Sequence, residues 1–221
     1  MTLSRTLEPE TMDGLDEAVA YLEMNHSAVN RCFVDDLFAG GSTGPRVIDL
    51  GCGPAILSIE IASRAPTIEV MGIDLSGEML DLAKIEIDLA GMLYQISLHQ
   101  ADAKSMEPYE DEIADTVVSN SLLHHLENPA STIKTAMRLV KTEGRVFIRD
   151  LMRPDTEAAL ERLVQLHAGD ENEVAQQLLR QSLHAALTLD EIRKIAQACG
   201  IDPDCVQSTS DRHWTIDWTR P

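Results

Sequence analysis

The sequence predicts an α/β fold: a seven-stranded, mostly parallel sheet with helices on both faces and an antiparallel hairpin at the C-terminal end. The first observation behind this prediction is an alternation of short apolar runs with helical stretches, which begins near residue 45. Such alternation is typical of parallel strands joined by right-handed crossover helices. The second observation is that the last two apolar runs, 205–210 and 212–218, lie too close together for a crossover helix. They therefore predict an antiparallel hairpin.

Five earlier apolar runs predict the parallel strands, and helical spacing of apolar residues predicts the helices between them. The predicted strands cover residues 46–50, 68–74, 96–100, 115–120 and 144–150. The predicted helices cover residues 55–64, 76–91 and 129–141, with two or three more across 155–199 and two within 13–38. The helix over 76–91 opens with a serine cap and closes on a glycine, which are ordinary start and stop signals.

The length of 221 residues fits a single domain, which we divide into three regions. Residues 1–44 are a predicted N-terminal helical cap that ends at the glycine-rich break AGGSTGP. Residues 45–150 are the predicted cofactor-binding core, and residues 151–221 hold the substrate-side helices and the terminal hairpin.

The composition favours a cytoplasmic protein that acts on a small molecule. No stretch reaches the roughly 18–20 apolar residues that cross a bilayer, and the N-terminal residues lack a signal-peptide pattern. The four cysteines are scattered without metal-site spacing, so we expect reduced thiols and no bound metal. A net charge of −19 opposes binding to nucleic acid and to anionic membranes. We expect a small neutral or cationic partner, and a monomer or a homodimer.

The stretch VIDLGCGPAIL places a tight glycine turn between the first predicted strand and the next helix. Such a turn brings backbone amides and a helix N-terminus close to a polar ligand. A Walker-type phosphate loop requires a lysine, which the turn lacks. A dinucleotide fingerprint requires Gly or Ala where Ile56 stands, and Asp49 would repel a pyrophosphate. Asp49 suits instead the ammonium and sulfonium of S-adenosylmethionine.

Polar side chains at three further strand ends fit the same cofactor. Asp74 ends the second strand, where a carboxylate can accept hydrogen bonds from both ribose hydroxyls, although nicotinamide dinucleotide sites use an acid similarly. Asp102 follows the third strand, within reach of an adenine amino group, and Asn120 ends the fourth, beside the methionine part. The predicted cofactor-binding residues are Asp49, Gly51, Cys52, Gly53, Asp74, Leu75, Asp102, Ala103 and Asn120.

Over residues 45–150 these motifs resemble those of class I S-adenosylmethionine-dependent methyltransferases. VIDLGCGPA resembles their glycine-rich first motif, GIDLS the second, ADA the third and DTVVSNSLLHHLENP the fourth, with Ala55 where the first motif has its third glycine. The resemblance implies a Rossmann-like fold and methyl transfer by in-line displacement to a small-molecule acceptor, as in ubiquinone/menaquinone-type enzymes. Two alternatives stay open: a nicotinamide-dependent oxidoreductase, and a non-catalytic protein of this fold that only binds the cofactor.

The paired histidines after the fourth strand, His124 and His125, are the predicted catalytic residues. A neutral imidazole near pH 7 can take a proton from an attacking group on the acceptor. The alternative is that one histidine packs beneath the helix and the other is solvated. Arg149 has two equally good interpretations: it binds a substrate carboxylate, or it forms an internal ion pair. The predicted substrate-binding residues are Tyr21, His26, Arg149 and His213.

Overall fold

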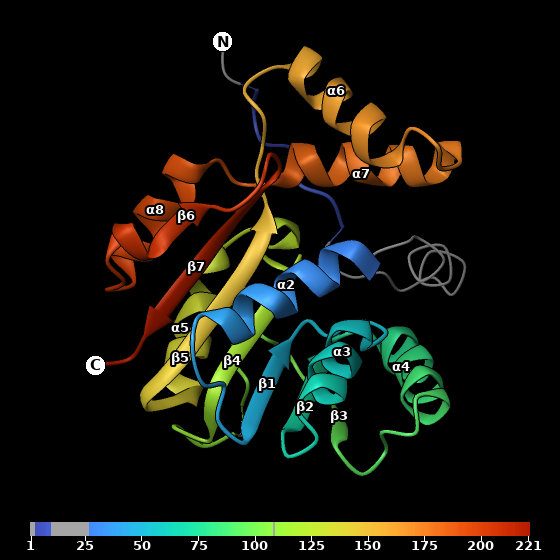
Figure 1. The fold of residues 1–221 in the computed structure, drawn as a ribbon. Coiled ribbons are helices and arrows are strands. Elements are labelled where there is room, and N and C mark those ends of the chain that lie inside the picture. Colours follow the sequence, from blue (N-terminus) through green and yellow to red (C-terminus); the bar gives the residue numbers. More distant parts are fainter. Residues whose placement is uncertain (1–2, 10–26, 108) are drawn as a thin grey trace.

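The computed structural model describes residues 3–9, 27–107 and 109–221, and the described residues form the predicted α/β fold. Seven strands make one sheet in the order β3-β2-β1-β4-β5-β7-β6 (Figure 1). The strands are β1 (Arg46–Leu50), β2 (Glu69–Asp74), β3 (Ile96–Gln100), β4 (Ala114–Asn120), β5 (Val140–Leu151), β6 (Val206–Ser208) and β7 (His213–Thr219). Strands β1 to β5 pair in parallel, whereas β7 runs antiparallel to both β5 and β6. The predicted terminal hairpin is therefore confirmed.

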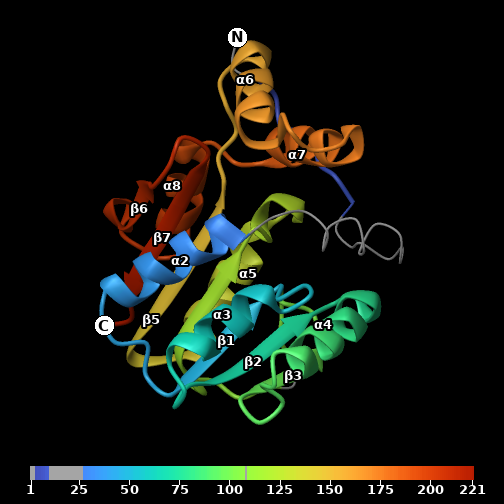
Figure 2. The ribbon, with the colours of Figure 1, turned by 45° about the vertical axis from the view of Figure 1, so that its right-hand side comes forward.

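Helices cover both faces of the sheet (Figure 2). On one face Phe33 and Ile61, from α2 and α3, share an apolar cluster with residues of α4. On the other face Ile133 and Ile192, from α5 and α8, join a second cluster that surrounds the buried Trp214. The described helices are α2 (Ser27–Ala39), α3 (Ile56–Arg64), α4 (Gly77–Leu89), α5 (Pro129–Leu139), α6 (Glu157–Ala168), α7 (Glu173–Ala185) and α8 (Leu189–Ala198), with short 3-10 turns η1 (Leu123–His125) and η2 (Pro203–Cys205).

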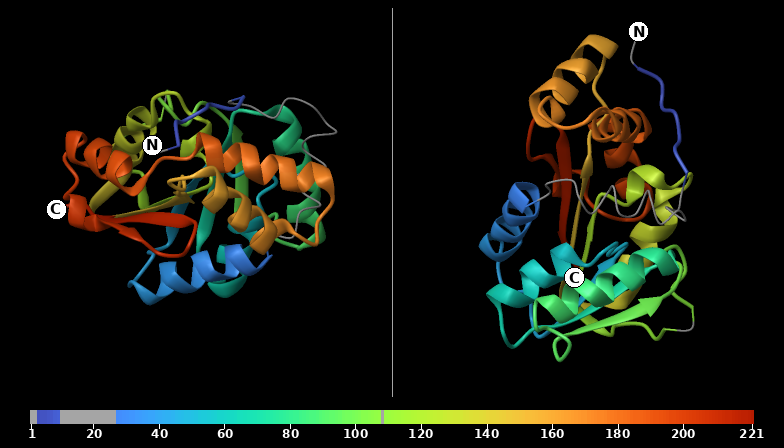
Figure 3. Two further views of the ribbon diagram at one scale, coloured as in Figure 1. Left: turned by 90° about the horizontal axis from the view of Figure 1, so that it is seen from above. Right: turned by 90° about the vertical axis from the view of Figure 1, so that its right-hand side faces the viewer.

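Helices α6 and α7 form a lobe beyond the carboxyl ends of the parallel strands (Figure 3). Leu160 and Val164 of α6 pack with Leu183 of α7 and with Leu151, the last residue of β5. This cluster stands apart from the two clusters that cover the sheet. The lobe therefore overlies the sheet edge at which the predicted site residues gather.

Two details differ from the sequence prediction. Strand β5 begins at Val140, because Val140 pairs with Ala114 across a register shift in β4, and α5 consequently ends before it. Of the two helices predicted within 13–38, one is α2, and the other lies outside the described residues. Among the described helices, none has the length and apolar character needed to cross a membrane.

Candidate active site

A cavity of about 460 Å³ opens at the carboxyl ends of β1, β2 and β4. Open α/β sheets commonly bind ligands at this edge. Ser27 and Asn30 of α2 line the cavity from the side of the N-terminal region. All nine predicted cofactor-binding residues line it: Asp49, Gly51, Cys52, Gly53, Asp74, Leu75, Asp102, Ala103 and Asn120. Their roles toward a ligand remain a prediction.

Backbone amides of the glycine turn after β1 form hydrogen bonds to strand β2. The N–H groups of Gly51 and Cys52 both donate to the carbonyl oxygen of Ile73, at 2.8 and 2.9 Å. The N–H of Gly53 donates to Oδ2 of Asp74 at 2.8 Å. The sequence predicts that amides of this turn face a ligand, but these three amides hold the turn in place. We therefore expect a ligand to contact side chains and the start of α3 rather than these amides.

Ala55, at the end of the turn, adopts a backbone conformation that favours glycine. Its φ of 61° and ψ of 18° are left-handed, and its side chain is fully buried. An L-residue in this region is strained by roughly 1–2 kcal/mol. No side chain caps the N-terminus of α3. The partial positive charge at this end of the helix therefore faces the turn without a side-chain oxygen to cap it.

Asp49 lies buried behind the turn, with 1% of its surface exposed. Its Oδ2 accepts a hydrogen bond of 2.6 Å from the hydroxyl of Ser58 in α3. Burial raises the pKa of Asp49 to about 7; the Ser58 hydrogen bond opposes this rise, and the negative charge of Asp74 adds to it. A nearby cation favours the ionised form of such a carboxyl. This wall of the cavity therefore suits a positively charged group of a ligand.

Asp74 ends β2 with both carboxylate oxygens in hydrogen bonds to backbone amides. Oδ2 accepts from Gly53 at 2.8 Å and Oδ1 from Ser76, the cap of α4, at 2.9 Å. A carboxylate has about four lone-pair sites, so this group can also accept from a ligand hydroxyl. Burial raises the pKa of Asp74, although the backbone hydrogen bonds oppose that rise. The neighbouring Leu75 is 41% exposed and offers apolar surface beside these oxygens.

Asn120 supplies an unsatisfied acceptor to the cavity. Its Oδ1 is buried and has no hydrogen-bond partner among the described residues. Such a group destabilises a protein by roughly 1–3 kcal/mol unless a donor reaches it. A ligand ammonium would be a suitable donor. With Asp49 and Asp74, which also line the cavity, Asn120 makes its wall rich in hydrogen-bond acceptors.

Asp102 lies at the outer side of the same cavity, after β3. Its Oδ1 accepts from the amide of Lys104 at 2.8 Å, and its Oδ2 lies 3.6 Å from the Lys104 ammonium. The side chain is 40% exposed. An exposed acid of this kind contributes less to binding than a buried one, because water competes for its hydrogen bonds.

The two histidines of η1 have different surroundings. His124 is buried, with Nδ1 at 2.5 Å from Asp150 and Nε2 at 3.2 Å from Glu8. Burial alone would lower the pKa of His124, but the two carboxylates raise it to about 10. His124 is therefore a charged imidazolium with both nitrogens engaged, and it does not line the cavity.

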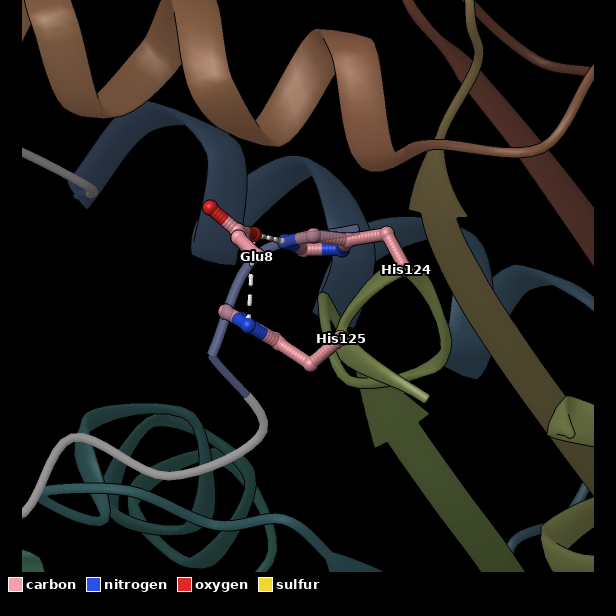
Figure 4. A group of neighbouring side chains, drawn as sticks. All are labelled: Glu8, His124 and His125. Carbon is pink, nitrogen blue, oxygen red and sulfur yellow. Dashed lines mark ion pairs between the residues drawn. The ribbon is translucent and has the colours of Figure 1, made fainter. Parts of the chain in front are cut away.

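His125 lines the cavity and keeps 14% of its side chain exposed. Its Nδ1 lies 3.3 Å from the carbonyl oxygen of Pro9 and 3.2 Å from Glu8 (Figure 4). Burial and the charge of His124 lower the pKa of His125 to about 4. His125 is thus neutral at pH 7 and is the one of the pair that faces the cavity.

Arg149 and His213, the two predicted substrate-binding residues in the described part of the chain, do not line the cavity. Arg149 is buried, pairs with Asp36 at 2.6 Å and donates to Thr215 at 2.9 Å, which is the internal ion pair that we considered as the alternative. His213 is also buried, with Nδ1 at 2.8 Å from the hydroxyl of Ser210. No contact supports a substrate role for either residue. The remaining two, Tyr21 and His26, lie outside the described residues.

Sequence reasoning missed Glu8, Arg5 and Asp150, whose side chains surround the histidine pair. Residues 3–9 have no regular secondary structure, so no periodic pattern marked Glu8 and Arg5. Glu8, His124 and His125 have metal-type ligand atoms within 4.8 Å of one another. Within this cluster Nε2 of His124 pairs with Glu8 itself, and Nδ1 of His125 also contacts the carbonyl oxygen of Pro9. The absence of a metal stays a prediction.

Fold and cavity define the class of this protein as an α/β protein with an acid-lined cavity at the carboxyl edge of its sheet. Residues 42–201 match the family model of a methyltransferase domain, and the chain belongs to that family. This match confirms the resemblance to class I methyltransferases.

The relative and the two solved structures that follow share between 13% and 34% of their residues with this chain over the aligned regions. The ubiquinone biosynthesis O-methyltransferase of Nitrosomonas europaea is 34% identical over 131 residues, which are 59% of this chain and 53% of that protein. The chain therefore spans about half the length of this relative. A solved S-adenosylmethionine-dependent methyltransferase from Aquifex aeolicus has a TM-score of 0.68 at 13% identity, covering 94% of this chain and 99% of that one. The plantazolicin methyltransferase, solved with S-adenosylhomocysteine, has a TM-score of 0.65 at 21% identity, covering 83% and 66%.

Proposed function

We propose that this chain is an enzyme that binds S-adenosylmethionine in the cavity and methylates an oxygen atom of a small molecule. The observation that carries the proposal is the convergence of Asp49, Asp74 and Asn120 on one cavity, in a chain of the methyltransferase domain family. Family membership favours methyl transfer over the nicotinamide-dependent oxidoreductase. Asp49 beside the turn argues in the same direction, because it would repel a pyrophosphate.

Different residues of the cavity would bind different parts of the cofactor. Asp74 would accept hydrogen bonds from the ribose hydroxyls, with Leu75 beside it for the adenine ring. Asn120 and Asp49 would face the cationic methionine part, since one has a free acceptor and the other a carboxyl that a cation ionises. Asp102 would accept from the adenine amino group.

His125 is the proposed general base. When bound, S-adenosylmethionine supplies a methyl group already activated on a sulfonium. His125 lines the cavity as a neutral imidazole, so it can take the proton of an acceptor hydroxyl during transfer and release it to solvent afterwards. His124 has no free nitrogen and acts only through its neighbours. The rest of the rate enhancement would come from alignment and exclusion of water.

The acceptor is proposed to be small and to react through oxygen. The relatives quoted above include an O-methyltransferase, which points to oxygen as the attacked atom. No described residue that lines the cavity is Phe, Tyr or Trp, so stacking on a large planar acceptor has no platform there. The net charge of −19 opposes nucleic acid as a partner. The four free cysteines fit a cytoplasmic location. Whether the protein is a monomer or a homodimer stays a prediction.

The test is a transfer assay with S-adenosylmethionine that carries a deuterated methyl group. The purified protein is incubated with a panel of small hydroxyl, thiol and amine acceptors, and products are identified by mass spectrometry. We expect labelled methyl on hydroxyl acceptors, with one S-adenosylhomocysteine formed per product. Asp74→Asn should abolish labelling at low cofactor concentration, whereas Asp211→Asn, away from the cavity, should not. Cofactor binding without transfer to any class would favour the non-catalytic alternative.

A further inference from the structure

The N-terminal segment, residues 3–9, docks against the loop that carries the two histidines (Figure 3). The guanidinium of Arg5 donates to three carbonyl oxygens: those of Ala185 at 2.6 Å, His124 at 3.1 Å and Leu126 at 3.0 Å. The carbonyls of His124 and Leu126 flank His125 in the chain. A planar guanidinium is well suited to joining several fixed acceptors. Arg5 therefore ties the segment to both sides of His125.

Glu8 brings a largely buried negative charge to the same place. Its carboxylate lies 3.2 Å from Nε2 of His124 and 3.2 Å from Nδ1 of His125, and it accepts from the hydroxyl of Ser182 in α7 (Figure 4). The Glu8 side chain is 11% exposed. A carboxylate next to a ring favours the protonated imidazole. Any positive charge that forms on His125 would thus have its counter-ion in position.

The Pro9 carbonyl fixes which nitrogen of His125 carries the hydrogen. Nδ1 lies 3.3 Å from this oxygen, and a carbonyl oxygen can only accept. The hydrogen of a neutral ring must then be on Nδ1, which leaves the lone pair on Nε2. A general base needs such a lone pair.

We propose that the N-terminal segment is a positioning element for methyl transfer: Arg5 anchors it, and Glu8 and Pro9 hold His125 with a bare Nε2 toward the acceptor. This inference rests on the proposed function. In the transfer, the acceptor hydroxyl would lose its proton to Nε2 as its oxygen takes the methyl group; the broken carbon–sulfur bond leaves its electron pair on sulfur, so S-adenosylhomocysteine is released. The resulting imidazolium is opposed by burial and by the charge of His124, and Glu8 and Asp150 offset part of this opposition.

The first test reads the tautomer of His125 and needs no acceptor. Long-range proton–nitrogen NMR spectra of protein with ¹⁵N-labelled histidine distinguish the two neutral tautomers, and His125→Gln assigns the signal. We expect the Nδ1–H tautomer in the wild-type protein and a mixture in Arg5→Ala. If Arg5→Ala does not fold, Arg5→Lys replaces it, because a lysine ammonium cannot bind all three carbonyl oxygens in the same geometry. We then expect a partial shift from the Nδ1–H tautomer toward a mixture. A bare Nδ1 in the wild-type protein, or no change in both variants, would overturn the inference.

The second test separates positioning from a merely structural role. Glu8→Gln should lower kcat about 10-fold or more while KM for S-adenosylmethionine stays unchanged, and the pH–rate profile should move because the base loses its counter-ion. Glu8→Asp should recover part of kcat. Asp211→Asn, which removes the carboxylate from the pair between Asp211 and His167, is the matched control and should leave both readouts unchanged.

The two proposals can fail separately. If S-adenosylmethionine does not bind, the proposed function fails whatever the tautomer of His125 is. If the cofactor binds and methyl is transferred, but Glu8→Gln retains the wild-type kcat and pH profile, only the positioning inference fails.

Discussion

The backbone amide of Gly53 donates a hydrogen bond of 2.8 Å to the carboxylate of Asp74, so the acid at the end of β2 also holds the turn after β1. The two strands are neighbours, and Asp49↔Gly72 and Leu50↔Ile73 are register partners in them. Asp74 therefore joins the two halves of the proposed cofactor site. A change at this position acts on the shape of the turn and on the ligand at once.

Asp74→Asn should weaken binding of S-adenosylmethionine and of S-adenosylhomocysteine by similar factors, because both share the ribose. Hydrogen bonds to a charged group contribute roughly 1.5–3 kcal/mol, so the loss should be about 10- to 100-fold. Asp102→Asn is the comparison, with a smaller loss, because Asp102 is 40% exposed. Isothermal titration calorimetry measures both. A loss confined to S-adenosylmethionine would contradict a ribose contact.

Affinity for S-adenosylmethionine should depend on the ionisation of Asp49. Burial raises the pKa of this carboxyl to about 7, and a cationic ligand group lowers it again. Below pH 7 binding must therefore release a proton, so the dissociation constant should fall as pH rises from about 6 to 8 and then level off. Titrations over this range, in buffers of different ionisation enthalpy, measure both affinity and proton release. Asp49→Asn should bind weakly and without this dependence; an unchanged slope in the variant would assign the proton to another group.

Removing one partner of the buried pair between His124 and Asp150 should strongly destabilise the protein. Asp150 is fully buried and also accepts from the amides of Leu123 and Leu151, so Asp150→Asn leaves a buried imidazolium with reduced compensation. Breaking a buried pair in this way costs about 3–5 kcal/mol of unfolding free energy. Urea denaturation at pH 7 measures the loss. Asp81→Asn, at an exposed pair with Lys84, should change little.

The same pair predicts a pH dependence of stability. Its neighbours raise the pKa of His124 from 6.5 to about 10, so its stabilisation is complete below pH 6.5 and is lost as pH rises through about 10. The pKa of Asp150 is lowered by His124, so its share is lost only in acid, below its ordinary value of 3.8. Unfolding free energy should therefore fall between pH 7 and 10 in the wild-type protein. A flat profile there would mean that His124 is neutral in the fold.

Ala55→Gly should change stability by less than about 1 kcal/mol. Relief of left-handed strain gains roughly 1–2 kcal/mol, whereas the lost buried methyl costs about 0.8 and the freer unfolded chain about 0.5–1. Ala55→Val should cost at least about 2 kcal/mol, because a β-branched residue fits this conformation poorly and overpacks a buried position. Thermal and urea unfolding compare the two variants. Equal stability of both would show that position 55 is not left-handed in solution.

The cofactor side of the cavity was predictable from sequence because parallel strands end at one edge. Asp49, Asp74 and Asn120 lie at or near the ends of β1, β2 and β4, so identifying the strands was enough to bring their side chains together. The terminal hairpin followed from the short connection between its strands in the same way. Both predictions needed only local patterns and the geometry of a parallel sheet.

The surroundings of His124 and His125 were less predictable from sequence. His124 and His125 are neighbours in a 3-10 turn, and sequence alone does not say which ring enters the cavity and which meets Asp150. Glu8 lies more than a hundred residues from them in the chain, in a segment without regular structure, so only the folded contact reveals it. Arg149 was ambiguous because its partner, Asp36, comes from a helix on the far side of the glycine-rich break.

The most direct test of the central claim is a calorimetric titration of the wild-type protein and Asp74→Asn with S-adenosylmethionine, S-adenosylhomocysteine and NAD(H). The account predicts that both sulfur ligands bind the wild-type protein at one site per chain, that the variant binds them about 10- to 100-fold more weakly, and that NAD(H) gives no binding heat. Binding of NAD(H) alone, or no binding of any of the three, would contradict the assignment of this cavity to S-adenosylmethionine.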